Sequence, residues 1–197
     1  MKRRNFIQKG LLLSSSIALG SGAAVGAAKI SNPFGGKAKN TFKLKYAPHF
    51  GMFRHSAGDD PIDQLKFMSE MGFKALEDNG MKGRDKNLQE KIANQMGKTG
   101  MEMGVFVAHK IYWNEPNLAS GDKDKREEFL KDIQDSVEVA KRVNAKWMTV
   151  VPGFVDLRKD MGYQTANVVE SLRRASEILE PHGLAMVLEP LNFRDHP

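Results

Sequence analysis

The chain has 197 residues, of which 41% are hydrophobic and 27% are charged. This composition is typical of a folded soluble protein and excludes a disordered or fibrous one. The chain has no cysteine, which excludes disulfides, thiolate zinc sites, cysteine nucleophiles and a lipidated-cysteine anchor. Outside the first thirty positions, no apolar run approaches the ~20 residues of a membrane-spanning helix.

The first segment has the layout of an export signal. Residues 1–28 carry four cations and no acid, and continue with a mildly apolar stretch and small residues, which is the order of a secretory signal peptide. The pair Arg3–Arg4 resembles a twin-arginine signal. We therefore expect residues 1–28 to engage the twin-arginine export machinery, to direct the protein to the periplasm and to leave no stable membrane span after cleavage. Residues 29–41 are expected to be a linker, and an uncleaved anchor or a frayed tail is the alternative.

The formal net charge of +6 belongs mostly to this leader. Without its four cations, 26 Lys and Arg stand against 24 Asp and Glu, which is a net charge of +2. A nucleic-acid partner requires a concentrated basic face that displaces counterions. The charge balance therefore predicts no nucleic-acid partner.

From residue 42 onward, short apolar runs alternate with amphipathic stretches. Strands are predicted over residues 43–47, 73–77, 101–108, 147–151 and 184–188. Four helices are predicted. The first begins at Pro61 after an Asp60 cap and ends at Gly72, and the second includes residues 88–96 and ends at Gly100. The third covers residues 123–143, and the fourth includes residues 168–179 and stops at Pro181. Apolar strands between amphipathic helices predict an α/β fold with a parallel sheet covered by helices. Units of roughly 30–40 residues suit either a β/α barrel or a doubly wound sheet.

Titratable side chains follow four of the five predicted strands. His49 follows the first strand, Glu77 ends the second, His109 follows the third and Glu189 follows the fifth. Catalytic groups in parallel α/β folds lie at this carboxyl edge, where they bind a metal or tune one another's pKa for proton transfer. His49 shares a Gly-, Phe- and Met-rich loop with His55, and we expect neither to be a ligand.

Glu189 is the strongest of these candidates. It directly follows the apolar run 185–188, where a carboxylate is costly unless it meets a cation or hydrogen-bond donors. Pro190 holds Glu189 extended and stops further strand pairing, so the carboxylate is expected to project from the strand end. An exposed loop carboxylate or a salt-bridge partner is the alternative.

The remaining strand-end residues have two interpretations each. His109 precedes the aromatic segment 110–113, which suits a pocket wall, but a lone histidine is more often structural. Glu77 has Asp78 beside it. The alternative to a functional role is that either carboxylate is simply exposed to solvent. Asn192 is suited to bind a hydroxyl or a catalytic side chain, or to cap its loop.

The fifth strand carries a family resemblance. Its sequence Leu-Glu-Pro-Leu-Asn at 188–192, followed by Arg-Asp-His-Pro at 194–197, resembles that of hydroxypyruvate isomerases and related xylose-isomerase-like sugar isomerase/epimerase barrels. Other segments agree in order and spacing: 72–77, 107–109 and 147–153. The resemblance spans residues 42–197 and implies a (β/α)8 TIM barrel. A barrel of eight strands typically has ~250 residues, so about the first five β/α units are expected here, with the chain truncated at its C-terminus.

The resemblance also implies a chemistry. In that family, a divalent metal and two glutamates at the ends of strands five and eight act on the substrate. Glu189 is thereby implied to be a metal ligand and an acid/base in isomerisation through an enediol(ate), and His109, Glu77 and Asn192 are implied to bind the substrate. The substrate is a small-molecule sugar or keto acid, and the cofactor is Mg, Mn, Co or Zn. Because ligands from strands six to eight are missing, the fragment alone is expected to be inactive.

Two other classes of function stay open. A noncatalytic exported sugar-binding module or a vestigial barrel would keep the aromatic rim and need no metal. An endonuclease of the same superfamily is less favoured, because it requires clustered histidines and a basic groove, whereas the five histidines here are scattered. Assembly into a homo-oligomer is compatible with the sequence.

Overall fold

The structure is a computed structural model that describes residues 42–192, so the expected signal peptide and nearly all of the expected linker lie outside the described residues. The helices are α2 (Arg54–Ala57), α3 (Pro61–Glu70), α4 (Lys86–Thr99), α5 (Lys123–Val143) and α6 (Met161–Leu179), with 3-10 turns η2 (Met81–Gly83), η3 (Leu118–Ser120) and η4 (Glu180–His182). The strands are β1 (Ala75–Leu76), β2 (Glu102–Met103), β3 (Trp147–Val150) and β4 (Ala185–Leu188). None of the described helices is long and apolar enough to span a bilayer.

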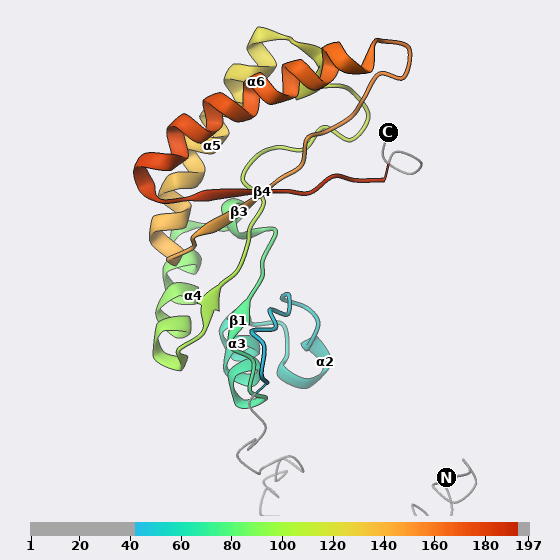
Figure 1. Ribbon diagram of the computed structural model, residues 1–197. Helices are drawn as coiled ribbons and strands as arrows, with labels where there is room; N and C mark the ends of the chain where they lie inside the picture. The colour runs from blue at the N-terminus through green and yellow to red at the C-terminus, as the bar shows by residue number, and fades with distance from the viewer. Residues whose placement is uncertain (1–41, 193–197) are drawn as a thin grey trace, which may run out of the picture. The chain divides into compact units, whose positions relative to one another are not determined.

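Five consecutive segments run parallel to one another, in chain order (Figure 1). β1 pairs with β2, and β3 pairs with β4 along its whole length. Single bridges complete the series: His49 pairs with Glu77, and Val107 pairs with Thr149. Along the chain, at least one helix lies between each of these parallel strand positions and the next. The described residues therefore contain five successive strand positions of a β/α fold.

The first predicted strand, over residues 43–47, is wrong. The segment makes no regular strand, and its pairing begins only at Pro48, whose carbonyl accepts a hydrogen bond from the Glu77 backbone N–H at 3.2 Å. The large side chains of the segment are exposed, with Leu44 at 65% and Tyr46 at 52%. Without burial on either face, these residues lack the packing that stabilises a strand.

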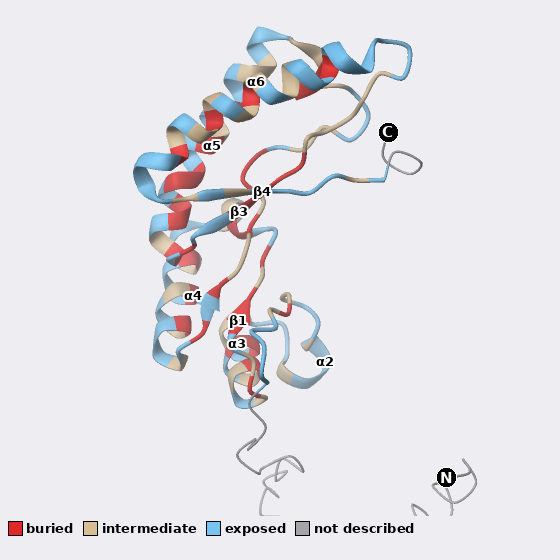
Figure 2. Ribbon diagram, viewed as in Figure 1, coloured by how far each residue is buried: buried red, intermediate tan, exposed pale blue. Residues whose placement is uncertain are grey.

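The helices cover one face of the strands. Alternate strand residues point to opposite faces, and Met148 and Val150 of β3 are fully buried in the main core, whereas Thr149 points the other way. Thr149 pairs with Val187 of β4, which is 43% exposed. Consecutive helices pack on one another, and buried positions recur along α4, α5 and α6 (Figure 2). We call the face that carries Thr149 and Val187 the inner face.

Three of the helices begin with the same device. Each has an aspartate N-cap and, four residues later, a glutamine that is 2–3% exposed: Asp60 and Gln64, Asp85 and Gln89, Asp160 and Gln164. The aspartates accept hydrogen bonds from first-turn N–H groups, which helix starts otherwise leave unsatisfied. The glutamines bond to backbone of the loop before the helix. The loops at the carboxyl edge of the strands are thus tied to the helices that follow them.

Candidate functional site

A pocket of about 190 Å³ lies at the carboxyl ends of β3 and β4. Three loops form its wall: the loop after β2, the loop after β3 and the residues directly after β4. The lining residues are Ile111, Tyr112, Trp113, Val151, Pro152, Gly153, Phe154, Val155, Pro190 and Leu191. None of these side chains carries a formal charge, so the pocket suits an uncharged or apolar group.

Glu189 stands beside this pocket. Its backbone N–H donates to the Val150 carbonyl at 3.1 Å, and the next residue, Pro190, lines the pocket. Because Glu189 follows Val187 by two positions, both belong to the inner face. The side chain is exposed, and within residues 42–192 its carboxylate has no hydrogen bond or ion pair. The predicted position at a strand end is confirmed, and the carboxylate is available to a ligand. Asn192 is exposed just beyond the pocket.

His109 is buried, and both of its ring nitrogens contact backbone. Nε2 accepts a hydrogen bond from the Val151 N–H at 3.1 Å, and Nδ1 lies 2.8 Å from the Lys110 carbonyl oxygen. An accepting Nε2 requires the neutral tautomer with its proton on Nδ1. Burial lowers the pKa of His109, which favours this neutral form. The ring joins the ends of two strands, and its predicted contact with substrate stays a prediction.

A charged cluster anchors the loop that carries His109. Lys82 donates from Nζ to Asp132 Oδ1 at 2.6 Å and to the Ala108 carbonyl at 2.9 Å. The other oxygen of Asp132 accepts from the Lys110 N–H at 2.9 Å. Burial acts to raise the pKa of Asp132, but the hydrogen bonds from Lys82 and Lys110 and the charge of Lys82 outweigh it, so the pKa is lowered. The carboxylate form is thereby favoured.

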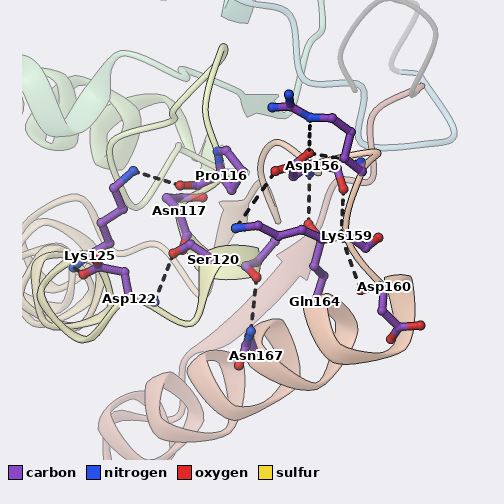
Figure 3. A network of polar contacts seen from close by, with 12 residues as sticks. Pro116, Asn117, Ser120, Asp122, Lys125, Asp156, Lys159, Asp160, Gln164 and Asn167 are labelled. Carbon is purple, nitrogen blue, oxygen red and sulfur yellow. Dashed lines mark hydrogen bonds and ion pairs between the residues drawn. The ribbon is translucent and has the colours of Figure 1, made fainter.

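Residues of α6 hold two of the loops around the pocket. Figure 3 shows Gln164 reaching into the loop that follows β3, where it accepts from the Asp156 N–H at 2.9 Å and donates to the Asp156 carbonyl at 3.0 Å. One turn away, Asn167 donates to the Ala119 carbonyl at 3.2 Å. The loop after β2 and the loop after β3 thus share one support, α6.

Gly153 and Asn117 make a close contact at the pocket wall. The φ of Gly153 is +94°, a left-handed value that disfavours every residue with a Cβ. A Cβ added at this position would lie 2.4 Å from Asn117 Oδ1. Asn117 is 3% exposed, and its Oδ1 has no hydrogen-bond partner among the described residues. Only glycine fits here.

The aromatic part of the wall is also held by charges. Tyr112 donates from its hydroxyl to Glu128 at 2.5 Å, and the Lys110 ammonium lies 4.3 Å from the centre of its ring. Ammonium groups are attracted to the faces of aromatic rings. These contacts fix Tyr112, and its neighbour Trp113 is 50% exposed at the same pocket.

The two acids after β1 separate into different surroundings. Asp78 is buried and accepts from the guanidinium of Arg84, with Nε at 2.6 Å from Oδ2. Glu77 is half-buried, and its Oε1 lies 3.4 Å from Nε2 of His49. Asp78 therefore supports its loop, whereas Glu77 remains at the carboxyl edge with a histidine beside it.

The described residues do not complete a metal site. Across residues 42–192, no three His, Asp or Glu side chains come together in an arrangement that could hold an ion. Divalent cations such as Mg²⁺ prefer several oxygen ligands, and Glu189 supplies one carboxylate. The residues at hand do not by themselves fit the expected cofactor.

Sequence reasoning missed the supports of the site. The buried glutamines had a readable signal, because the spacing Asp-x-x-x-Gln recurs at Asp60, Asp85 and Asp160. The contact between Gly153 and Asn117 had none beyond the glycine itself. The pairing of His49 with Glu77 depends on which strands are neighbours, which a single sequence does not state.

The chain belongs to the xylose isomerase-like TIM barrel family, whose model matches residues 65–197. Among solved structures, it is similar to an AP endonuclease, family 2, from Brucella melitensis, at 20% identity and a TM-score of 0.63, covering 78% of this chain and 57% of that one. It is also similar to a 3-keto-D-glucoside 4-epimerase from E. coli, at 20% identity and a TM-score of 0.59, covering 76% and 57%. A third is a D-psicose 3-epimerase with D-tagatose from Clostridium cellulolyticum H10, at 18% identity and a TM-score of 0.60, covering 78% and 54%.

These similarities establish the predicted barrel fold. The chain spans only 54–57% of the length of these three structures. No curated protein matches the chain significantly. The hydroxypyruvate isomerase specificity expected from the sequence is not established by these matches.

Proposed function

We propose that the chain carries part of the active site of a sugar isomerase or epimerase, in which Glu189 is the acid/base. The observation that carries this proposal is the position of Glu189, an exposed carboxylate without a described partner beside an apolar pocket. Catalytic groups of TIM barrels occupy this edge of the strands. Solved neighbours named as sugar epimerases support the class of reaction.

The proposed reaction moves a proton next to a carbonyl group. The Glu189 carboxylate accepts the proton from the carbon beside the carbonyl, and the electron pair of the broken C–H bond forms the enediolate. Return of a proton to the neighbouring carbon, with a proton moving between the two oxygens, completes an isomerisation. Return of a proton to the original carbon from the opposite face completes an epimerisation. The pocket would hold the part of a sugar or keto acid, such as hydroxypyruvate, that does not react. Substrate contacts from Glu77, His109 and Asn192 belong to this proposal.

A divalent metal (Mg, Mn, Co or Zn) is part of the proposed enzyme, with Glu189 as one ligand. Such an ion would polarise the oxygens of the substrate. Residues 42–192 provide no complete set of ligands for such an ion, so the proton transfer is assigned to Glu189 alone.

Deuterium exchange tests the proposal. The full-length native protein, with Mn²⁺ or Mg²⁺ added, is incubated with D-fructose and with hydroxypyruvate in D2O. Incorporation of deuterium next to the carbonyl is expected, and Glu189→Gln is expected to reduce the rate by at least ~100-fold, which is the scale of general acid–base catalysis. Glu180→Gln, on the exposed turn η4, is the matched control. Equal exchange by Glu189→Gln and the native protein would reject Glu189 as the base.

We also propose that the protein is exported. The support is the sequence of residues 1–28, with Arg3 and Arg4 ahead of an apolar stretch. The twin-arginine route carries folded proteins, which suits an enzyme that acquires its metal before export.

A further inference from the structure

We propose that His49 and Glu77 together bind a hydroxyl group of an uncharged sugar or polyol. The inference rests on the proposed sugar isomerase function and extends it to a second group of residues. The two side chains end neighbouring parallel segments, with His49 Nε2 and Glu77 Oε1 3.4 Å apart. It reverses the sequence-based expectation that His49 is not a ligand.

The backbone aims both side chains at one face. Residues that pair across a bridge project from the same side of a sheet. Glu77 also lies two positions after Ala75 and one after Leu76, and Leu76 is fully buried in the core with the helices. Glu77 therefore points away from the core, and His49 points with it. Glu77 and Glu189 thus both project from the strand faces that point away from this core, at the carboxyl edge.

The pair keeps hydrogen-bonding capacity that His109 has lost. Both ring nitrogens of His109 contact backbone, whereas His49 places Nε2 3.4 Å from Glu77 Oε1 and has no hydrogen bond at Nδ1 within the described residues. The side chains of His49 and Glu77 are 38% and 32% exposed, so a solute reaches them. The neighbouring Asp78 does not compete, because Arg84 occupies it.

The loop that carries His49 is fixed rather than loose. The Gly51 N–H donates to Gln64 Oε1 at 2.7 Å, and Gln64 Nε2 donates to the Gly58 carbonyl at 2.9 Å. Gln64 is 2% exposed and belongs to α3, so the turn after His49 is bound to a packed helix. A binding group that is positioned in advance loses less entropy when the ligand arrives.

The chemistry of the pair selects a hydroxyl group. A hydroxyl both donates and accepts, which matches a carboxylate acceptor beside an imidazole that offers either role. A phosphate would meet the negative charge of Glu77, while the nearby guanidinium of Arg84 is already paired with Asp78. The pair therefore favours an unphosphorylated ligand.

Proton NMR of the histidine rings tests this inference with D-fructose as the probe. The full chain has five histidines, and the His49 ring signal is assigned by its loss in His49→Gln. We expect D-fructose to shift this signal in the native protein, and the shift to be lost in Glu77→Gln. D-fructose 6-phosphate is expected to shift it less than D-fructose does.

Binding measurements provide the second readout. Loss of one hydrogen bond in His49→Gln is expected to weaken D-fructose binding by about 2- to 10-fold, with an unchanged far-UV circular dichroism spectrum. His55→Gln, an exposed histidine in α2, is the matched control and is expected to bind normally. An unmoved His49 signal with D-fructose, or equal affinity of His49→Gln and native protein, overturns the inference. Glu189→Gln separates it from the proposed reaction, since that variant should keep the His49 shift while losing deuterium exchange.

Discussion

Replacing Gly153 by alanine should destabilise the protein through two effects that can be separated. A residue with a Cβ in the left-handed region costs roughly 1–2 kcal/mol, and Gly153 has a φ of +94°. The new Cβ would also lie 2.4 Å from Asn117 Oδ1, and overpacking of this kind typically costs ~1–3 kcal/mol. The expected loss in the free energy of unfolding is therefore about 2–5 kcal/mol.

Gly183 provides the matched control. Its φ is +64°, and a Cβ there would meet no atom within 4 Å, so Gly183→Ala carries only the backbone cost of roughly 1–2 kcal/mol. Urea unfolding followed by circular dichroism measures both variants. The excess loss in Gly153→Ala, about 1–3 kcal/mol, is assigned to Asn117.

A double-mutant cycle with Asn117→Ala isolates this contact. Without the Asn117 side chain, Gly153→Ala should cost no more than Gly183→Ala does. If Gly153→Ala is no more destabilising than Gly183→Ala in the native background, the close approach of Asn117 does not restrict position 153 and the prediction is refuted.

Two further predictions concern the anchors of the loop after β2. Burial depresses the pKa of His109 below its ordinary 6.5 in the folded state, so the unfolded chain takes up a proton first and stability falls as the pH drops below about 6.5. His109→Gln should therefore make the urea-derived stability fall less steeply in acid, and an unchanged slope would contradict this role. Asp132→Asn should lower the free energy of unfolding by about 1–3 kcal/mol, because Lys82 and the Lys110 N–H lose their carboxylate; urea unfolding showing no loss would count against the cluster.

Most helix boundaries could be predicted because their signals are local, although α6 begins at Met161, before the predicted stretch 168–179. The long helix was expected over residues 123–143, and α5 occupies that range. Asp60 caps α3 as predicted, and α4 ends at Gly100 with a φ of +68°. Caps and left-handed glycines act within a few residues of their own position, so one sequence contains the information.

The candidate site was only partly predictable, because its hydrogen bonds join distant residues. The position of Glu189 follows from its own strand and was predicted. The partners of His109 were not, since one of them is Val151, 42 positions away. The contact between His49 and Glu77 could not be predicted for the same reason. The sequence assigns the two residues to the ends of separate strands, but it does not indicate that their side chains are neighbours.

The recurring Asp-x-x-x-Gln device has a consequence for how this scaffold can diversify. Gln64, Gln89 and Gln164 each tie a loop to the helix directly after it, so the tip of such a loop can accept new residues or insertions while the helix start stays in place. α5 differs, because it has Arg126 at the corresponding position and its preceding loop is held by Asn167 of the following helix. Changes at the tips of the loops before α3, α4 and α6 can thus leave the start of the following helix in place, whereas the loop with the aromatic residues must change together with α6, which holds it.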